Sequence, residues 1–199
     1  MKKLIVGILI LFCSPVWVIA GSPKSITPET ALQAYLNNSD KSFKWEVQDK
    51  MKTEGATLFR ILFTSQQWRG IDWNHEMTVM VPDNLKYNDA LLFITGGSVK
   101  EGKPNTHKWT ENLTTSLTGV ARTNKAIIAI LWQVPNQPLY GDLTEDALIS
   151  HTLHNYLKDG DFTWPLLFPM TKSAVRAMDV VQKFAKKEVK HKISHFVVS

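Results

Sequence analysis

The residues of this chain best suited to chemistry are those of the segment Gly96-Gly97-Ser98. They directly follow the apolar run 90–94, where a buried strand is expected to end. Glycine leaves backbone N–H groups open to a ligand, and such groups can stabilise the oxyanion of a reacting carbonyl. The sequence therefore predicts an oxyanion-type turn at Gly96, Gly97 and Ser98, with a plain tight turn as the competing interpretation.

A second polar segment follows the apolar run 126–131 and is bounded by prolines. Trp132 offers a flat wall, and Gln133, Asn136 and Gln137 offer amide donors and acceptors. We predict that these four residues form a pocket loop at the end of a strand. A rigid connector whose amides satisfy loop backbone is the more common structure for such a segment.

No complete catalytic set accompanies these two loops. His151 and His154 stand three apart on an expected helix, a spacing that could bring two metal ligands together. No His-Glu-x-x-His pattern surrounds them, so surface histidines are the expected interpretation. Ser199 is not preceded by glycine and is the last residue, which makes it a poor nucleophile. We therefore predict no catalytic residue, no metal site and no cofactor in this chain.

The elements that must position these residues follow from the hydrophobic pattern. Alternating segments predict two strands in a hairpin, and runs that are apolar on both faces predict buried parallel strands. The expected strands cover 56–68, 75–81, 90–94, 126–131 and 193–198. The expected helices cover 28–36, 109–122, 142–158 and 171–189.

Antiparallel strands come first in this order, and strand–helix–strand units follow. That order predicts an α/β fold with one mixed, mostly parallel sheet and helices on both faces. No proline-rich or glycine-rich linker divides the chain, so residues 21–199 are expected to form one domain.

The first twenty residues have the pattern of a signal peptide. A basic start is followed by the apolar run 4–12, which is too short to span a bilayer, and cleavage is expected after Ala20. An uncleaved anchor or a lipidated Cys13 is less well supported. Cys13 is the only cysteine, so the cleaved protein would have no thiol chemistry. We predict a secreted or periplasmic protein without a stable membrane anchor.

The chain has a formal net charge of +5, and several of its basic residues lie between Lys183 and Lys192. A solvated helix end explains this segment better than a nucleic-acid surface, so no nucleic-acid partner is predicted. The expected ligand is an unknown small molecule, a peptide or a host surface.

Four segments of the chain are distinctive, namely 90–97, 132–139, 145–149 and 164–179. The last of them, Trp-Pro-Leu-Leu-Phe-Pro-Met-Thr-Lys-Ser-Ala-Val-Arg-Ala-Met-Asp, is far longer than a short motif. Together they resemble the PhoPQ-activated pathogenicity-related protein family over nearly all of the chain after residue 20. The resemblance implies a secreted protein similar to α/β-hydrolases. It also implies, for some Gram-negative bacteria, control by PhoP/PhoQ and a link to virulence.

The resemblance transfers only Gly96, Gly97 and Ser98 as site residues, in the role of an oxyanion turn. Family members continue past a strand like 195–198 into a Gly-x-Ser-Lys-Arg-Gly nucleophile elbow, and then supply an acid and a histidine. This chain stops at Ser199. We therefore expect the N-terminal half of an α/β-hydrolase-like domain, truncated before the nucleophile elbow.

The function that the resemblance implies is hydrolysis of an ester or amide, with no activity expected from the chain in this form. A eukaryotic relative is a secreted repressor of cell proliferation, which implies that binding can matter more than turnover. A non-catalytic exported binding protein is therefore the alternative.

Overall fold

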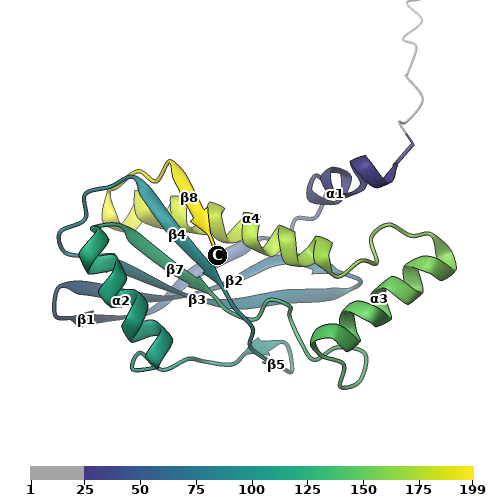
Figure 1. Cartoon of the computed structure of the whole chain (residues 1–199), viewed down its shortest axis with the longest axis horizontal. Helices are drawn as coiled ribbons and strands as arrows, with labels where there is room; N and C mark the ends of the chain where they lie inside the picture. The colour runs from purple at the N-terminus through teal and green to yellow at the C-terminus, as the bar shows by residue number, and fades with distance from the viewer. Residues whose placement is uncertain (1–24) are drawn as a thin grey trace, which may run out of the picture.

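A six-stranded mixed sheet organises the molecule in the computed structural model, which describes residues 25–199 (Figure 1). The predicted signal peptide and the cleavage site after Ala20 lie outside the described residues. The strands are β1 (Lys44–Thr53), β2 (Ala56–Trp68), β3 (Ile71–Pro82), β4 (Asp89–Ile94), β7 (Ile127–Leu131) and β8 (His195–Val198). Their order across the sheet is β1-β2-β3-β7-β4-β8. A separate two-stranded ribbon consists of β5 (Val99–Lys100) and β6 (Lys103–Pro104).

The α/β class and the mixed sheet are confirmed, but the parallel share is smaller than predicted. Three of the five neighbouring strand pairs are antiparallel. The two parallel pairs both include β4, which lies between β7 and β8. Tight turns at 54–55 and 69–70 join β1, β2 and β3, and such short links allow only antiparallel neighbours. The sequence does not predict β1, because polar residues occupy much of it and most of them are exposed.

The helices are α1 (Pro28–Leu36), α2 (Asn112–Asn124), α3 (Glu145–Asp159) and α4 (Leu167–Phe184). Thr27 begins α1 with a capping box and Pro28 takes its first position, as the sequence predicts. Gly160, with φ of 70°, ends α3 in the left-handed conformation. The long C-terminal helix is predicted as 171–189. It is α-helical only to Phe184, and a π-helical turn, Ala185–Val189, completes it.

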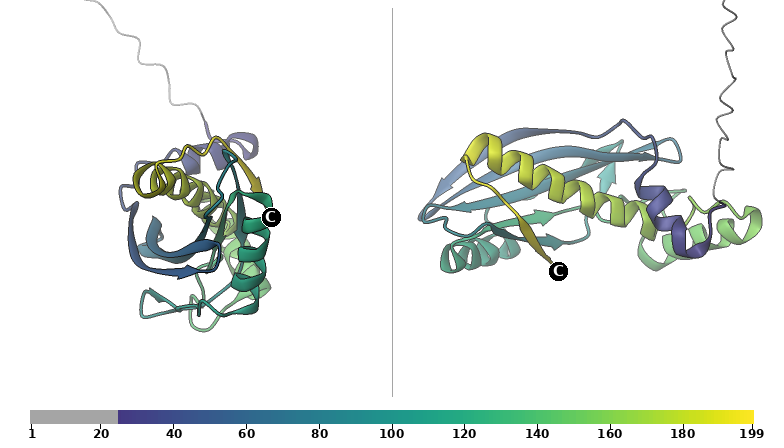
Figure 2. Two further views of the ribbon diagram at one scale, coloured as in Figure 1. Left: turned by 90° about the vertical axis from the view of Figure 1, so that its left-hand side faces the viewer. Right: turned by 90° about the horizontal axis from the view of Figure 1, so that it is seen from above.

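Helices cover both faces of the sheet, as Figure 2 shows with α2 and α4 on opposite sides. The apolar cluster on the α4 face is the larger of the two. In it, Val180, Val181 and Phe184 of α4 pack with Met77 and Val79 of β3. The α2 face is a second apolar cluster, with these buried members: Ala56, Leu58, Met80, Ala121, Ile128, Ile130 and Trp132. Burial of apolar area on both faces holds the parallel strands together.

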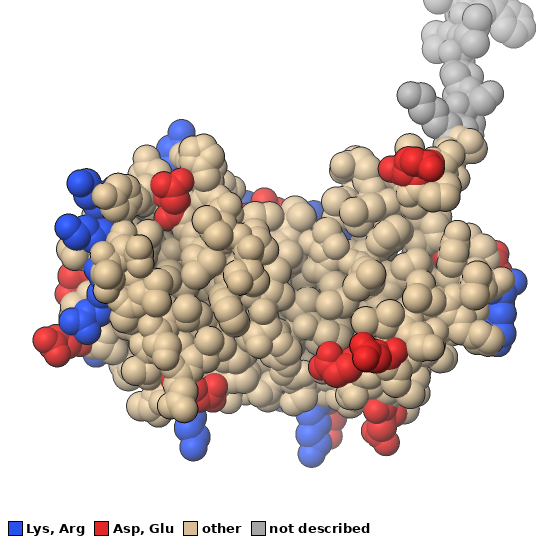
Figure 3. Space-filling view, viewed as in Figure 1, with Lys and Arg blue, Asp and Glu red and all other residues tan. Residues whose placement is uncertain are grey.

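The end of the β2–β3 hairpin is covered by α1, α3 and the loop before α4. Trp68 and Trp73 are fully buried there, at 2% and 0% exposed, against Tyr35, Leu148 and Leu166. These tryptophans are therefore core residues. The front of the molecule around β8 is largely free of charged side chains, which gather towards its rim (Figure 3).

Candidate active site

The predicted oxyanion turn lies at the carboxyl end of β4, where its backbone is tied to the end of β7. Thr95 N–H donates to the carbonyl of Leu131 at 2.9 Å, and Gln133 N–H donates to the carbonyl of Gly96 at 3.2 Å. In the described part of the chain, neither Gly96 nor Gly97 uses its N–H group for a hydrogen bond to protein. Two successive backbone donors are thus available to an oxygen atom of a ligand.

A side chain is disfavoured at one position of this turn and accommodated at the other. The φ of Gly97 is 156°, and a Cβ atom there would lie 3.0 Å from Gln133 Cγ and 3.1 Å from Gln133 N. A Cβ atom on Gly96 would meet only Glu145 Oε1, at 3.9 Å, which is ordinary contact. The close approach of Gln133 and the positive φ therefore make a side chain at residue 97 strained, whereas residue 96 has room for one.

Ser98 has a different role from the two glycines. Its N–H donates to Asn105 Oδ1 at 2.9 Å, and its carbonyl accepts the Asn105 N–H at 2.9 Å. The backbone of Ser98 is thus already occupied. The oxyanion role stays a prediction for this segment, and it depends on Gly96 and Gly97.

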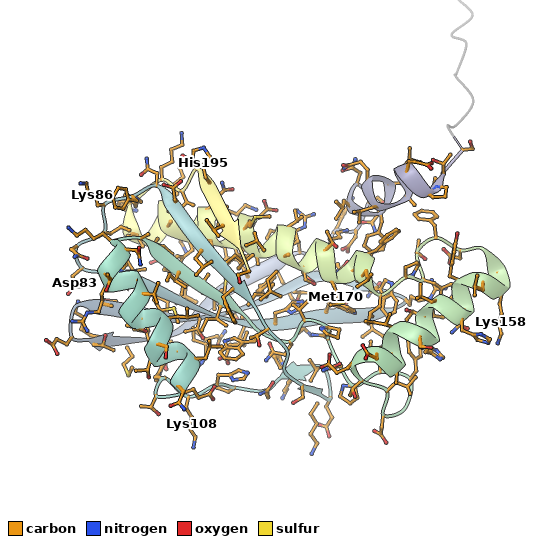
Figure 4. All side chains as sticks on the ribbon, in the orientation of Figure 1. Asp83, Lys86, Lys108, Lys158, Met170 and His195 are labelled. Carbon is orange, nitrogen blue, oxygen red and sulfur yellow. The ribbon has the colours of Figure 1, made fainter. Side chains whose placement is uncertain are left out.

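The end of β8 lies beside the same turn. Ser199 N–H donates to the carbonyl of Leu92 at 3.0 Å, and Ile94 N–H donates to the carbonyl of Ser199 at 2.8 Å. The two parallel strands therefore end at the same edge of the sheet, where the C mark of Figure 1 lies. His195, labelled in Figure 4, lies at the opposite end of β8 and faces away from this edge. A group that follows Val198 in the chain would thus stand next to the glycine turn.

The four predicted pocket-loop residues are buried and bonded within the fold. Trp132 Nε1 donates to a threonine of β3 at 3.0 Å, and Asn136 Nδ2 donates to a β3 carbonyl at 2.6 Å. Gln133 Oε1 accepts a β3 N–H at 2.8 Å, and Gln137 Oε1 accepts the Glu145 N–H at 2.9 Å. These side chains brace the loops around the turn, and their direct contact with a ligand stays a prediction.

Asn105 and His107 contact this region closely, although the sequence does not single them out. Asn105 Oδ1 accepts from Gln133 Nε2 at 3.0 Å as well as from Ser98. The His107 ring stacks on Trp132 with centroids 3.6 Å apart and an interplanar angle of 10°. Both residues lie in the irregular segment 105–111, where Asn105 is exposed and His107 is half-buried, and no periodicity of the sequence marks either position. The only signal in the sequence is a polar Asn-x-His cluster just before a helix, which is ordinary in loops.

A buried polar network centred on His75 supports the loop from the α4 face. His75 is 0% exposed, its Nδ1 lies 3.0 Å from the carbonyl of Trp132, and its Nε2 lies 3.1 Å from Ser65 Oγ. Since a carbonyl only accepts, Nδ1 carries the proton and Nε2 accepts from Ser65. Burial lowers the pKa of His75 to about 4, although the backbone of Trp132 and Gln133 favours the charged form. His75 is therefore neutral at physiological pH.

A buried ion pair supports the loop from the α2 face. Arg60 Nε lies 3.4 Å from Glu76 Oε2, and the Glu76 side chain is 1% exposed. Burial raises the pKa of Glu76, against the hydrogen bond from His107 N–H and the charge of Arg60. The guanidinium also donates to the carbonyl of His107 at 2.7 Å and lies 4.3 Å over the Trp109 ring. The pair thus fixes the backbone on which His107 stands.

A surface groove of about 480 Å³ lies between β1, β2, β3 and the β5–β6 ribbon. Its polar lining includes Lys44, Glu46, Thr64, Asn74 and Lys103. It is separate from the two free N–H groups, because none of the turn residues lines it.

The paired histidines lie apart from all of these groups. His151 Nε2 bonds the side chain of Asn155, one turn later in α3, at 3.1 Å. Within residues 25–199, no three His, Cys, Asp or Glu side chains are grouped closely enough to hold a metal ion. Over the same residues, no helix combines the length and the apolar composition needed to cross a bilayer.

The sequence of the chain matches the model of a known family over residues 32–199, described as PhoPQ-activated pathogenicity-related protein. The match covers the sheet, the Gly96–Gly97 turn, and the loops that contain Asn105 and Trp132. The chain belongs to the PhoPQ-activated pathogenicity-related protein family. The predicted family is therefore confirmed.

Among curated relatives, the chain is similar to autocrine proliferation repressor protein A of Dictyostelium discoideum. The two are 27% identical over 182 residues, which are 85% of this chain and 35% of the relative. The chain thus spans about a third of the length of this relative.

Among solved structures, the fold is similar to that of a provisionally assigned acetyl xylan esterase from Bacteroides fragilis. The TM-score is 0.51 at 15% identity, covering 84% of this chain and 44% of that one. Acetyl xylan esterase 1 from a Thermoanaerobacterium species has a TM-score of 0.47 at 16% identity, covering 77% and 45%. The first likeness supports the α/β fold, and the chain spans less than half of either structure.

Proposed function

We propose that this chain supplies the scaffold and the oxyanion-binding turn of a serine hydrolase that acts on an ester or an amide. One observation carries the proposal: two successive N–H groups, on Gly96 and Gly97, have no hydrogen-bond partner among residues 25–199 and lie at the carboxyl end of β4, next to the end of β8. Family membership and an esterase-like fold support it. The Dictyostelium relative is much longer than this chain, so the proposal concerns the activity of a full-length family protein.

The chemistry follows from where charge develops. When a nucleophile attacks an ester carbonyl, its oxygen becomes an oxyanion, and N–H donors already aimed at that position stabilise the transition state. Each such donor contributes about 2.7–4 kcal/mol in enzymes of this kind. The nucleophile would come from a residue after β8, because a strand-to-helix elbow there places a serine beside the turn.

The test compares two proteins in hydrolysis of a chromogenic acetyl ester. The present chain is expected to give no saturable turnover. A version extended past Ser199 with the corresponding segment of a longer family member is expected to be active. Gly97→Ala in that version should lower kcat about 100-fold, because it displaces the donors. Gly119→Ala in α2, where an added Cβ atom meets nothing within 4 Å, is the control. Turnover by the present chain that Ser98→Ala abolishes would refute the proposal.

A non-catalytic exported binding protein is the second candidate, and the name of the Dictyostelium relative favours it. A binding module formed by residues 21–199 should unfold cooperatively as a monomer, with a peptide, a small molecule or a host surface as its ligand. Thermal unfolding of these residues distinguishes the two candidates: a sharp transition of a monomer supports binding, whereas an aggregate supports an incomplete hydrolase domain.

Export and a role in virulence belong to the same proposal. The pattern of residues 1–20 supports a leader that is removed after Ala20. Sequencing the amino terminus of protein recovered from the periplasm or medium tests this. A terminus at Gly21 is expected, and full-length protein retained in the cytoplasm would contradict export.

A further inference from the structure

The residue after the glycine pair is held by Asn105, seven residues later in the chain. Asn105 Oδ1 accepts the Ser98 N–H at 2.9 Å and a Gln133 Nε2 proton at 3.0 Å. The backbone of Asn105 adds two bonds, from its N–H to the Ser98 carbonyl at 2.9 Å and from Gln133 Nε2 to its carbonyl at 3.1 Å. Gln133 is also the residue that a Cβ atom on Gly97 would meet. Asn105 therefore joins the two segments between which Gly97 is packed, through its side chain as well as its backbone.

The hydrogen bonds of Asn105 require one orientation of its amide. With Oδ1 towards Ser98, its Nδ2 faces His107 Nε2 at 3.2 Å. An amide turned by 180° would place N–H donors against the donors of Ser98 and Gln133. His107 Nε2 must then be an acceptor, so the neutral His107 ring carries its proton on Nδ1.

Glu111 supplies the reason for that tautomer. His107 Nδ1 lies 3.0 Å from Glu111 Oε2, and Lys108 N–H donates to Glu111 Oε1 at 2.9 Å. Burial acts to raise the pKa of Glu111, but the hydrogen bonds from Lys108 and His107 outweigh it and hold the pKa below its usual range. The carboxylate is thus charged at neutral pH and receives the Nδ1 proton of His107.

The His107 ring has little freedom to leave this position. One of its faces stacks on Trp132, and its backbone is bonded on both sides, to the Arg60 guanidinium through the carbonyl and to Glu76 Oε1 through the N–H at 3.1 Å. The side chain of His107 is 13% exposed. Lys108, the next residue, points outward below α2 in Figure 4, so the backbone turns from interior to solvent there.

We propose that Asn105 is the positioning residue of the Gly96–Gly97 turn, and that the His107–Glu111 pair orients its amide. The inference rests on the proposed function, since it explains how the two N–H groups are held ready for a ligand. Asn105 touches no reacting atom and acts through Ser98 and Gln133.

The experiment measures hydrogen exchange of the Ser98 amide by NMR in the full chain. Asn105→Ala should accelerate exchange at Ser98 by about tenfold, while amides in β7 keep their protection. Asn105→Asp keeps an acceptor for Ser98 and Gln133 and should leave exchange within about threefold of the original chain. Asn124→Ala is the control, because it removes the side-chain hydrogen bond of a different asparagine, at the end of α2.

A second readout tests the orientation. Asn105→Asp places a carboxylate against His107 Nε2, so Nε2 should change from acceptor to donor, which the nitrogen chemical shifts of the ring report by NMR. Unchanged Ser98 exchange in Asn105→Ala, equal acceleration throughout the sheet, or unchanged His107 ring-nitrogen shifts in Asn105→Asp would each overturn the inference. Hydrogen exchange does not depend on hydrolysis. An extended protein that is inactive but shows this exchange pattern would therefore contradict the proposed function and leave the positioning role of Asn105 intact.

Discussion

His75 makes the stability of this protein depend on pH in a way that can be calculated. The ordinary pKa of histidine is 6.5, and burial lowers that of His75 to about 4. The unfolded chain therefore binds a proton at a higher pH than the folded chain does. Stability from this residue is complete above pH 6.5 and falls as the pH drops towards 4.

The magnitude follows from the two pKa values. Each tenfold difference in proton affinity corresponds to about 1.4 kcal/mol, so the full loss is about 3 kcal/mol, with about 2.4 kcal/mol of it between pH 7 and pH 4.5. A protonated ring would also face Ser65 with a donor on Nε2, where it now accepts at 3.1 Å.

The assay is urea unfolding at pH 7, 5.5 and 4.5 for the original chain and for His75→Gln. The variant is expected to be less stable at pH 7, because it loses part of the buried network, but its stability should fall about 2 kcal/mol less towards pH 4.5. His154→Gln is the control, because it removes an exposed histidine of α3 and leaves the buried network of His75 intact. Parallel curves for His75→Gln and the original chain would refute the reasoning.

Three further changes have calculable results. Gly97→Ala should cost about 1–3 kcal/mol in unfolding free energy, because its methyl group displaces Gln133, whereas Gly96→Ala should change it by less than about 0.5 kcal/mol in the same urea assay. Arg60→Leu leaves the Glu76 carboxylate buried without its cation and should cost about 3–5 kcal/mol at pH 8, and the double variant with Glu76→Leu should recover much of that loss. A single variant as stable as the original chain would rule out the ion pair as a support. Val197→Lys should lower light scattering of the concentrated chain, because Val197 is 64% exposed on the strand at the sheet edge, and unchanged scattering would place self-association elsewhere.

The sequence best predicts the elements whose own hydrophobic pattern reflects which of their faces are buried. The apolar runs that form β4 and β7 are visible because these strands are covered on both faces. The run that forms β8 is also predicted as a buried strand, but β8 lies at the edge of the sheet, where Val197 and Val198 are exposed. β1 is missed because its outward positions are polar and its neighbours in the sheet decide its conformation. The change from α-helix to π-helix at Ala185 has no marker in the apolar stripe, which continues across it.

The candidate site divides in the same manner. Gly96 and Gly97 are predictable, because glycines after a buried strand mark a turn with open backbone. His75 is one of six histidines in the chain, and only the fold shows that it is fully buried. The roles of Asn105 and His107 depend on contacts with Ser98 and Trp132, which arise when two loops meet in space rather than from spacing along the chain.

The order of strands in the sheet also has a consequence for how the chain folds as it leaves a ribosome or a translocation channel. β1, β2 and β3 are neighbours in sequence as well as in space, so this meander has low contact order and can form first. β4 emerges next, yet its native neighbour β7 arrives only after residues 95–126 and must take the place between β3 and β4. Until then the edge of β3 is open, and β4 is the first strand able to occupy it. A pairing that joins β3 directly to β4 is therefore the kinetic trap expected for this topology, and β7 must displace it to take its place between the two strands.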